Sequence, residues 1–448
     1  MPDDDDQGLA RPPGRASEQP DDAAAIDRLI AKGDDHAAFG LLRTRLGWPT
    51  GKTVQTAELP RWLGLVAELA TRRGADPLAE LATAAVRDPD SPDRLYDLGY
   101  ALIDAGAPGI AASILWRCLA LVGESEEVVC ELVSALESAL AYHDALAVLT
   151  EHPVLRTRSF LCRYLYAFNG AMSGRLDLTR EALPSLEPDS PEAEVMAGNI
   201  AAIVARADRV AGATPLDDRD LRGWHYVLSG GLLVHQSPYG FDEPMHGRYA
   251  WLADSLPRIG TGLDRLVELV KGLALPCVYA PPGRGHEIVA LAAATKLGLP
   301  VAPWPAVGVP APGLVVLHDL ADLSAPDVTR LVQRRADQIL FAHASPWTQD
   351  SPIAPDVTTL LYQTLVAPWG QITELDPETR EVRSSSPDLR TNEAIAAEIV
   401  SGPGLDVSEL EADQPARWAA LVRVAWPPAP GPRSRLWAGG PVPSSRFS

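Results

Sequence analysis

The sequence contains little lysine and has an excess of acidic residues. Its 39 lysines and arginines stand against 59 aspartates and glutamates, which gives a formal net charge of −20 at pH 7. A surface of that sign repels the phosphates of nucleic acids and of anionic membranes. We therefore expect neither nucleic acid nor membrane as a partner.

Cysteine is also scarce, and no two cysteines have CxxC spacing. The four cysteines are Cys118, Cys130, Cys162 and Cys277. Three of them lie within apolar helical patterns, so we expect buried, reduced side chains rather than disulfides. There is no apolar run of about 18 residues that could span a membrane. The acidic, Pro-rich stretch 1–22 has no features of a signal peptide, and we expect it to be a disordered tail on a cytoplasmic protein.

Residues 23–212 have the pattern of an all-helical domain. Apolar residues recur at spacings of three and four, Gly or Pro interrupts the pattern every 12 to 20 residues or so, and β-branched runs are rare. The stretch "SPDRLYDLGYALIDAGAPGIAASILWRCLALVG" (91–123) places Leu98, Gly99, Leu102, Ala111 and Leu115 at offsets that resemble a tetratricopeptide (TPR) repeat.

Similar residues recur in a 34-residue register over about four units between 58 and 191. Leu132 and Tyr166 occupy the position of Leu98 in the next two units. The resemblance implies a stack of helical hairpins whose first helices line a concave surface. Two roles remain open for this surface: binding a protein partner, or only packing against the second domain.

Residues 216–375 predict an α/β domain. Short apolar strands in "PCVYA", "LPVAPW", "GLVVLHD" and "DQILFAHAS" alternate with helical segments such as "GHEIVALAAATKLG". This alternation is typical of a mainly parallel sheet flanked by helices. Ligands of such sheets bind at the carboxyl ends of the strands, so the loops after Ala280 and Leu317 are the candidate site.

The order of elements over 262–345 is similar to that of type I phosphoribosyltransferases. The resemblance implies a first loop that contacts pyrophosphate through its backbone and a later strand that ends in two acidic residues. A loop of Thr, Ser and Gly that wraps a phosphate should follow. In "APPGRGHE" the anion-binding candidates are Gly283, Arg284, Gly285 and His286, since glycines allow close approach and a helix N-terminus attracts anions. The alternative is a purely structural turn.

The second loop departs from the family pattern. It reads "LVVLHDLADLSAPDV", with His318 in place of the first acid, Asp319 in place of the second, and Asp322 where small donor residues are expected. No glycine is left to curl around a phosphate. We therefore predict poor binding of phosphoribosyl diphosphate. His343, at the start of "HASPWTQDSP" (343–352), which we expect to be a loop after a strand, is a further candidate for the same cleft.

The stretch 234–251, "VHQSPYGFDEPMHGRYAW", contains the loop candidates His235, Asp242, His246 and Arg248. Their spacing does not match that of a metal site on one element, so we expect neither a metal nor another cofactor. We expect a loop that covers the strand ends. Residues 376–448 should form loosely organised helices and a Pro-rich tail that is either disordered or an extended strap.

These observations favour a cytoplasmic protein-binding or scaffold protein with a non-catalytic phosphoribosyltransferase-like domain. The alternative is an enzyme that acts on a phosphorylated or nucleotide-like small molecule at a cleft between Arg284 and Asp319. The intact first loop also leaves room for a small anionic ligand.

Overall fold

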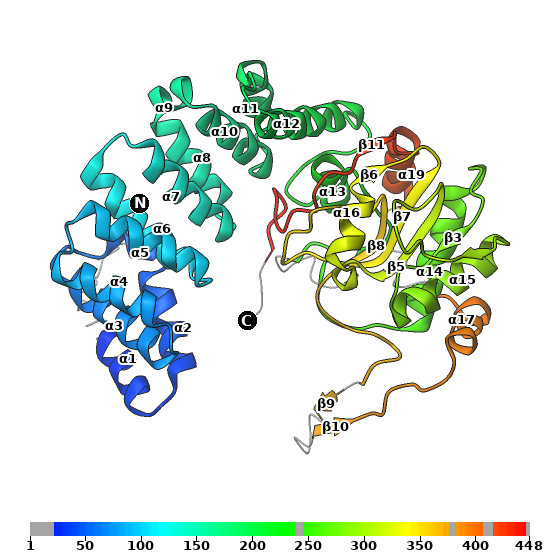
Figure 1. The fold of residues 1–448 in the computed structure, drawn as a ribbon, viewed down its shortest axis with the longest axis horizontal. Coiled ribbons are helices and arrows are strands. Elements are labelled where there is room, and N and C mark those ends of the chain that lie inside the picture. Colours follow the sequence, from blue (N-terminus) through cyan, green and yellow to red (C-terminus); the bar gives the residue numbers. More distant parts are fainter. Residues whose placement is uncertain (1–21, 239–244, 372, 376–381, 406–414, 445–448) are drawn as a thin grey trace, which may run out of the picture. The chain divides into compact units, whose positions relative to one another are not determined.

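The computed structural model describes residues 22–238, 245–371, 373–375, 382–405 and 415–444. The chain divides into two compact units, Met1–Val148 and Leu149–Ser448. The described part of the first unit contains helices and turns but no strand, whereas the second unit combines helices with a parallel sheet (Figure 1). The predicted fold class, helical followed by α/β, is therefore confirmed.

Helical pairs joined by short turns form the first unit. The pairs are α1 (Asp22–Ala31) with α2 (Asp35–Leu46), α3 (Leu59–Arg72) with α4 (Asp76–Arg87), and α5 (Pro92–Asp104) with α6 (Pro108–Val122). Helix α7 (Glu126–Ser138) packs on α6, and α8 (Tyr142–Glu151) follows it. Gly33, Gly74 and Gly106 reverse the chain within the three pairs at positive φ, a backbone conformation that glycine adopts without strain.

The small residues of the helical pattern allow close packing within a pair. A Cβ atom added to Gly99 of α5 would lie 2.5 Å from Cγ of Leu115 in α6, so a larger residue would push these helices apart. Leu98 and Leu132 are fully buried, and Tyr166 is almost so. The three positions that share one place in the 34-residue register are therefore all buried.

The second unit begins with further helices. These are α9 (Pro153–Arg158), α10 (Phe160–Met172), α11 (Leu176–Ala182), α12 (Pro191–Arg209) and α13 (Leu221–Ser229), with the 3-10 turn η2 (Leu183–Ser185) after α11. The Arg206 side chain of α12 donates to the carbonyls of Val227 and Leu228 at the end of α13. The predicted helical region 23–212 therefore extends across both compact units, and its last helices pack with the α/β part.

A seven-stranded parallel sheet lies at the centre of the second unit. Its order is β1 (Leu232–Leu233), β8 (Val357–Val366), β7 (Gln338–Pro346), β5 (Gly313–Asp319), β3 (Val278–Tyr279) and β4 (Val301–Ala302), and β2 (Tyr249–Ala253) also pairs with β8. All of these pairs are parallel. β3, β4, β5 and β7 are predicted from the sequence, whereas β2 and β8 are not.

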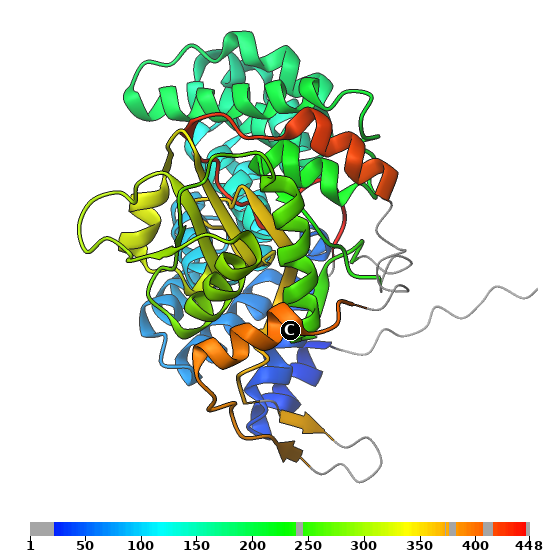
Figure 2. The same cartoon turned by 90° about the vertical axis from the view of Figure 1, so that its right-hand side faces the viewer.

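Both faces of the sheet are buried. Helices α14 (Leu256–Val270) and α15 (Arg284–Leu297) pack against the strands, and α17 (Asn392–Ser401) packs against both helices (Figure 2). A separate cluster includes the alternate residues Val315 and Leu317 of β5. Because successive strand residues point to opposite faces, these continuous apolar strands are suited to a sheet covered on both sides.

The described part of the C-terminal tail is an extended strap rather than a free end. β11 (Gly431–Pro432) pairs with β6 (Gln333–Arg334), and Leu436 pairs with Ser351. The Arg433 side chain is buried and donates to Asp356 and to the carbonyl of Leu331. The tail thus fixes itself to the α/β part through backbone pairing and a buried ion pair.

Candidate functional site

The carboxyl-terminal edge of the sheet brings together polar residues from several strands. Asp254 follows β2, His318 and Asp319 end β5, and His343 lies in the second half of β7. All four side chains are buried. The structure brings the candidates His318 and His343 together, since their rings are stacked with centroids 5.9 Å apart.

Asp254 is the centre of this cluster. Its Oδ2 atom lies 3.0 Å from Nε2 of His343 and 3.8 Å from Nε2 of His318. Its Oδ1 atom accepts from the backbone N–H of Ser255 and faces the guanidinium of Arg258 at 3.4 Å. Burial alone would raise the pKa of Asp254, but the two imidazoles outweigh it and hold that pKa well below its usual range. The cluster therefore contains an ionised carboxylate in the protein interior.

Burial disfavours the protonated form of two histidines, namely His343 and His286. Burial lowers the pKa of His343, and it lowers the pKa of His286 in α15 to about 4. Nδ1 of His286 accepts from the backbone N–H of His318 at 3.0 Å, which only an unprotonated nitrogen can do. The predicted anion candidate His286 thus packs inward and supports β5.

Asp319 is also engaged within the protein. Its Oδ2 accepts from the hydroxyl of Tyr362 at 2.5 Å, and its Oδ1 accepts from the backbone N–H of Ala321 at 2.9 Å. Burial raises the pKa of Asp319, against the opposing effect of these hydrogen bonds. Asp322, by contrast, is exposed. Asp319, which stands in place of the second acid of the family pattern, therefore has each carboxylate oxygen bonded to a neighbouring group.

The glycines of the "PPGRG" loop have local structural roles. Gly283 has φ +144°, a value that other residues rarely adopt. A Cβ added to Gly285 would lie 3.1 Å from Cβ of His318 and 3.2 Å from the ring of Trp369. Trp369 is buried, with its ring 4.7 Å from that of His318. The loop thus allows Trp369 to close over His318.

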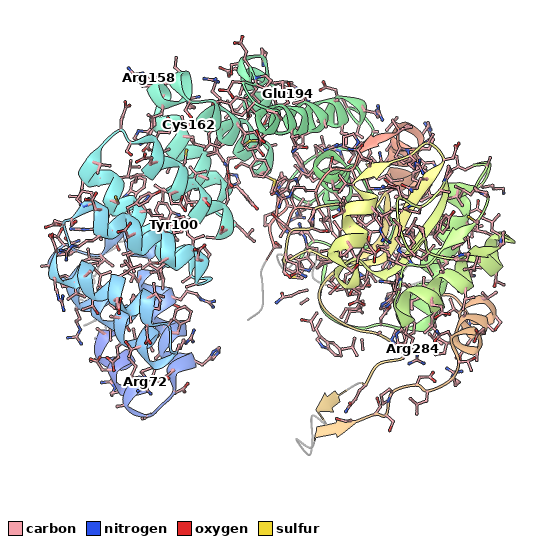
Figure 3. The ribbon with its side chains drawn as sticks, in the orientation of Figure 1. Arg72, Tyr100, Arg158, Cys162, Glu194 and Arg284 are labelled. Atoms are coloured by element: carbon pink, nitrogen blue, oxygen red, sulfur yellow. The ribbon has the colours of Figure 1, made fainter. Side chains whose placement is uncertain are left out.

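The Arg284 side chain contacts a segment about 100 residues further along the chain. Its Nη2 donates to the carbonyls of Asp388 and Arg390 at 2.7 and 3.0 Å, and its Nε lies 3.3 Å from Oδ1 of Asn392. Arg284 is exposed at the start of α15 (Figure 3). Three of its contacts are therefore to the segment that leads into α17, and none is to Asp319.

Two of the loop candidates, His235 and Arg248, bond to residues other than Asp254, His318 and His343. Nε2 of His235 lies 2.9 Å from the Tyr249 hydroxyl. Arg248 is buried and donates to the carbonyls of Val442 and Pro443 in the C-terminal strap. His246 is half-buried, and Asp242 lies outside the described residues. Arg248 thus anchors the strap.

Three residues of this edge escaped prediction from the sequence: Asp254, Tyr362 and Trp369. A usable signal was available for Asp254, because "YAWLAD" (249–254) ends an apolar strand with an acid in the same way as "LVVLHD".

Among the described residues, no group of three or more His, Cys, Asp or Glu side chains is placed to hold a metal ion. No described helix has both the length and the apolar character that crossing a membrane requires.

Comparisons with known proteins add little. No protein-family model and no curated protein sequence matches the chain. Among solved structures, the crystal structure of a purine phosphoribosyltransferase from Pyrococcus horikoshii Ot3 matches with 13% sequence identity and a TM-score of 0.22. The match covers 29% of this chain and 98% of that one. Function therefore has to be argued from the residues of this chain.

Proposed function

We propose that this chain is a protein-binding protein, in which the first helices of successive helical pairs form the binding surface. The α/β domain is the non-catalytic part of the molecule. The observation that carries this proposal is a surface on α5 and α7 that combines the exposed Tyr100 and Glu127 with the half-buried Tyr96 and Glu131.

The regular spacing of the helices supports a TPR-like repeat. The first helices of the pairs begin at Leu59, Pro92, Glu126 and Phe160, which are 33, 34 and 34 residues apart. The second helices begin at Asp76, Pro108, Tyr142 and Leu176. A constant period near 34 residues is the property expected of TPR units, which stack and present a concave surface.

The surface on α5 and α7 has the composition of a protein interface. Tyr100 of α5 is 51% exposed. Its neighbour Tyr96 has a raised pKa, first because of partial burial and then because of Glu131 and Glu127 of α7. Tyrosine is enriched in protein interfaces and among their strongest contributors. The adjacent glutamates favour a partner that presents lysine or arginine.

The strand-end edge supports the non-catalytic part of the proposal. The carboxylate of Asp319 is bonded to Tyr362 and Ala321, Arg284 is bonded to the 388–390 backbone, and Trp369 covers His318. A catalytic site needs groups that can reach a substrate. Here the groups expected to bind substrate are instead bonded to one another or to the chain.

A photo-crosslinking residue placed at position 100 tests the proposed surface. With p-benzoylphenylalanine in place of Tyr100, we expect irradiation of the full chain in native extract to give one discrete protein adduct. The same residue in place of Leu121, which is 43% exposed on the second helix α6, should give little of that adduct. The substitution Glu131→Lys should reduce the adduct at position 100, because it reverses a charge beside the surface.

Two results would contradict the proposal. One is the absence of any discrete adduct at position 100. The other is equal adduct at positions 100 and 121, which would show that crosslinking reports general exposure and not a binding surface.

A further inference from the structure

An open groove on the helical part of the second unit is lined by side chains of both charges. It lies between α9, α10 and the corner formed by α11 and η2, and its volume is about 620 Å³. Its lining includes Arg156, Arg163 and Tyr166 as well as Glu181 and Glu187. All of these residues lie in the unit Leu149–Ser448. The groove is therefore distinct from the surface on α5 and α7.

The two arginines are held in place but lack carboxylate partners. The guanidinium carbon of Arg156 lies 4.1 Å from the centre of the Tyr166 ring. Arg163 donates from Nη1 to the carbonyls of Arg156 and Thr157 near the end of α9. Among the described residues, neither arginine forms an ion pair, and the Nε atoms of both are buried without a hydrogen-bond partner.

This arrangement suits the recognition of an oxyanion. A guanidinium that stacks on an aromatic ring keeps its N–H groups in the plane, where they can bind a carboxylate through two parallel hydrogen bonds. Stacking also reduces the side-chain freedom that binding has to remove. In a chain with 59 acidic and 39 basic residues, two adjacent arginines without an acidic partner leave their charge available to a ligand.

The glutamates restrict which ligand fits. Glu181 lies in the last turn of α11 and Glu187 follows η2, and both side chains are exposed. No ion pair within 4.0 Å joins either of them to a described residue, so they do not neutralise Arg156 or Arg163. A ligand of negative charge only would be repelled by these glutamates, and one of positive charge only would be repelled by the arginines.

We propose that this groove binds an extended peptide segment in which acidic and basic residues alternate. Successive side chains of an extended chain point to opposite sides. One side can therefore present carboxylates to Arg156 and Arg163 while the other presents ammonium groups to Glu181 and Glu187. The inference rests on the proposed function in taking a peptide as the ligand, but it assigns a second surface and a different partner chemistry.

Fluorescence anisotropy with three labelled octapeptides tests this proposal on the full chain. The peptides are alternating Glu-Lys, all Glu and all Lys, measured at low salt. We expect the alternating peptide to bind about tenfold more tightly than either of the others. Arg156→Gln and Arg163→Gln should each weaken its binding about tenfold, since each removes a charge-assisted hydrogen-bonding group. Glu187→Gln should weaken it less, because a Lys contact lacks bidentate geometry.

Arg158→Gln is the matched control. Arg158 is exposed at the end of α9, does not line the groove, and is labelled in Figure 3. Its replacement removes the same charge from the same helix, and we expect less than about a twofold change. Thermal unfolding of each variant identifies any that fails to fold. If Arg156→Gln fails to fold, Arg156→Lys replaces it in the test. Lysine keeps the charge but lacks the planar guanidinium, so this variant should still weaken binding.

The proposal is overturned if the all-Glu peptide binds as tightly as the alternating one, if Arg158→Gln weakens binding as much as Arg156→Gln, or if none of the peptides binds. None of these outcomes affects crosslinking at position 100, which reports α5. Conversely, if no adduct forms at position 100 but the alternating peptide still binds, the proposed surface on α5 and α7 is rejected. The proposal for the groove then still stands.

Discussion

Replacing Asp356 with alanine is expected to lower the free energy of unfolding by about 3–5 kcal/mol, the usual cost of removing one partner from a buried ion pair. Asp356 is 1% exposed. Its Oδ1 accepts from Nε of Arg334 at 2.7 Å, and its Oδ2 accepts from Nη2 of Arg433 at 3.0 Å and from the backbone N–H of Leu340 at 2.8 Å. Without the carboxylate, the buried Arg433 guanidinium would lose its only close negative charge among the described residues.

Urea denaturation of the full chain measures this effect, and Asp264→Ala provides the control. Asp264 pairs with Lys296, and its carboxylate is 61% exposed. Surface pairs of this kind contribute about 0–1 kcal/mol. A loss below about 1 kcal/mol for Asp356→Ala would mean that the pairs with Arg334 and Arg433 do not hold the strap to the sheet.

Replacing Leu132 with alanine is expected to destabilise the first unit by about 2–5 kcal/mol. Leu132 is fully buried in α7. Truncating a buried leucine removes its apolar contacts and leaves a cavity that the surrounding helices fill only in part. The same denaturation experiment, followed by circular dichroism at a helix-sensitive wavelength, measures the loss.

Leu121→Ala is the control for this change, because Leu121 is 43% exposed on the neighbouring helix α6. We expect it to cost less than about 1 kcal/mol, since most surface substitutions have small effects. Equal effects of the two substitutions would contradict the packing of Leu132 between helices, and with it the register that relates Leu98 to Leu132.

The helices and several strands were predictable because their signals are local. The spacing of apolar residues and the intervening glycines specify the helical pairs, and "GLVVLHD" is a typical buried strand. β8, with the sequence "VTTLLYQTLV", was not predicted although valine and threonine favour strands. The hydroxyl of Thr358 lies 2.9 Å from that of Ser345 in β7, so the polar group is satisfied by a partner that the local sequence does not reveal.

The candidate site was predictable only in part, because several of its contacts join residues that are far apart in the sequence. His318 and His343 follow from the rule that parallel strands end at one edge. Asp254 was missed because β2 was not predicted, although "YAWLAD" (249–254) is an apolar stretch that ends in an acid. The partners of Arg284 are the carbonyls of Asp388 and Arg390. Contacts across about 100 residues cannot be inferred from the composition of the loop alone, so its glycines and arginine fit an anion site and a structural turn equally well.

The central claim is that the strand-end edge of the sheet is closed to phosphorylated ligands, so that function lies on the helical surfaces. Calorimetric titration of the full chain with phosphoribosyl diphosphate in the presence of Mg²⁺ tests this claim most directly. We predict no heat beyond dilution, because Arg284 and Asp319 are already bonded within the protein and the exposed Asp322 adds negative charge. Saturable binding in the micromolar range would contradict the claim and would indicate an enzyme.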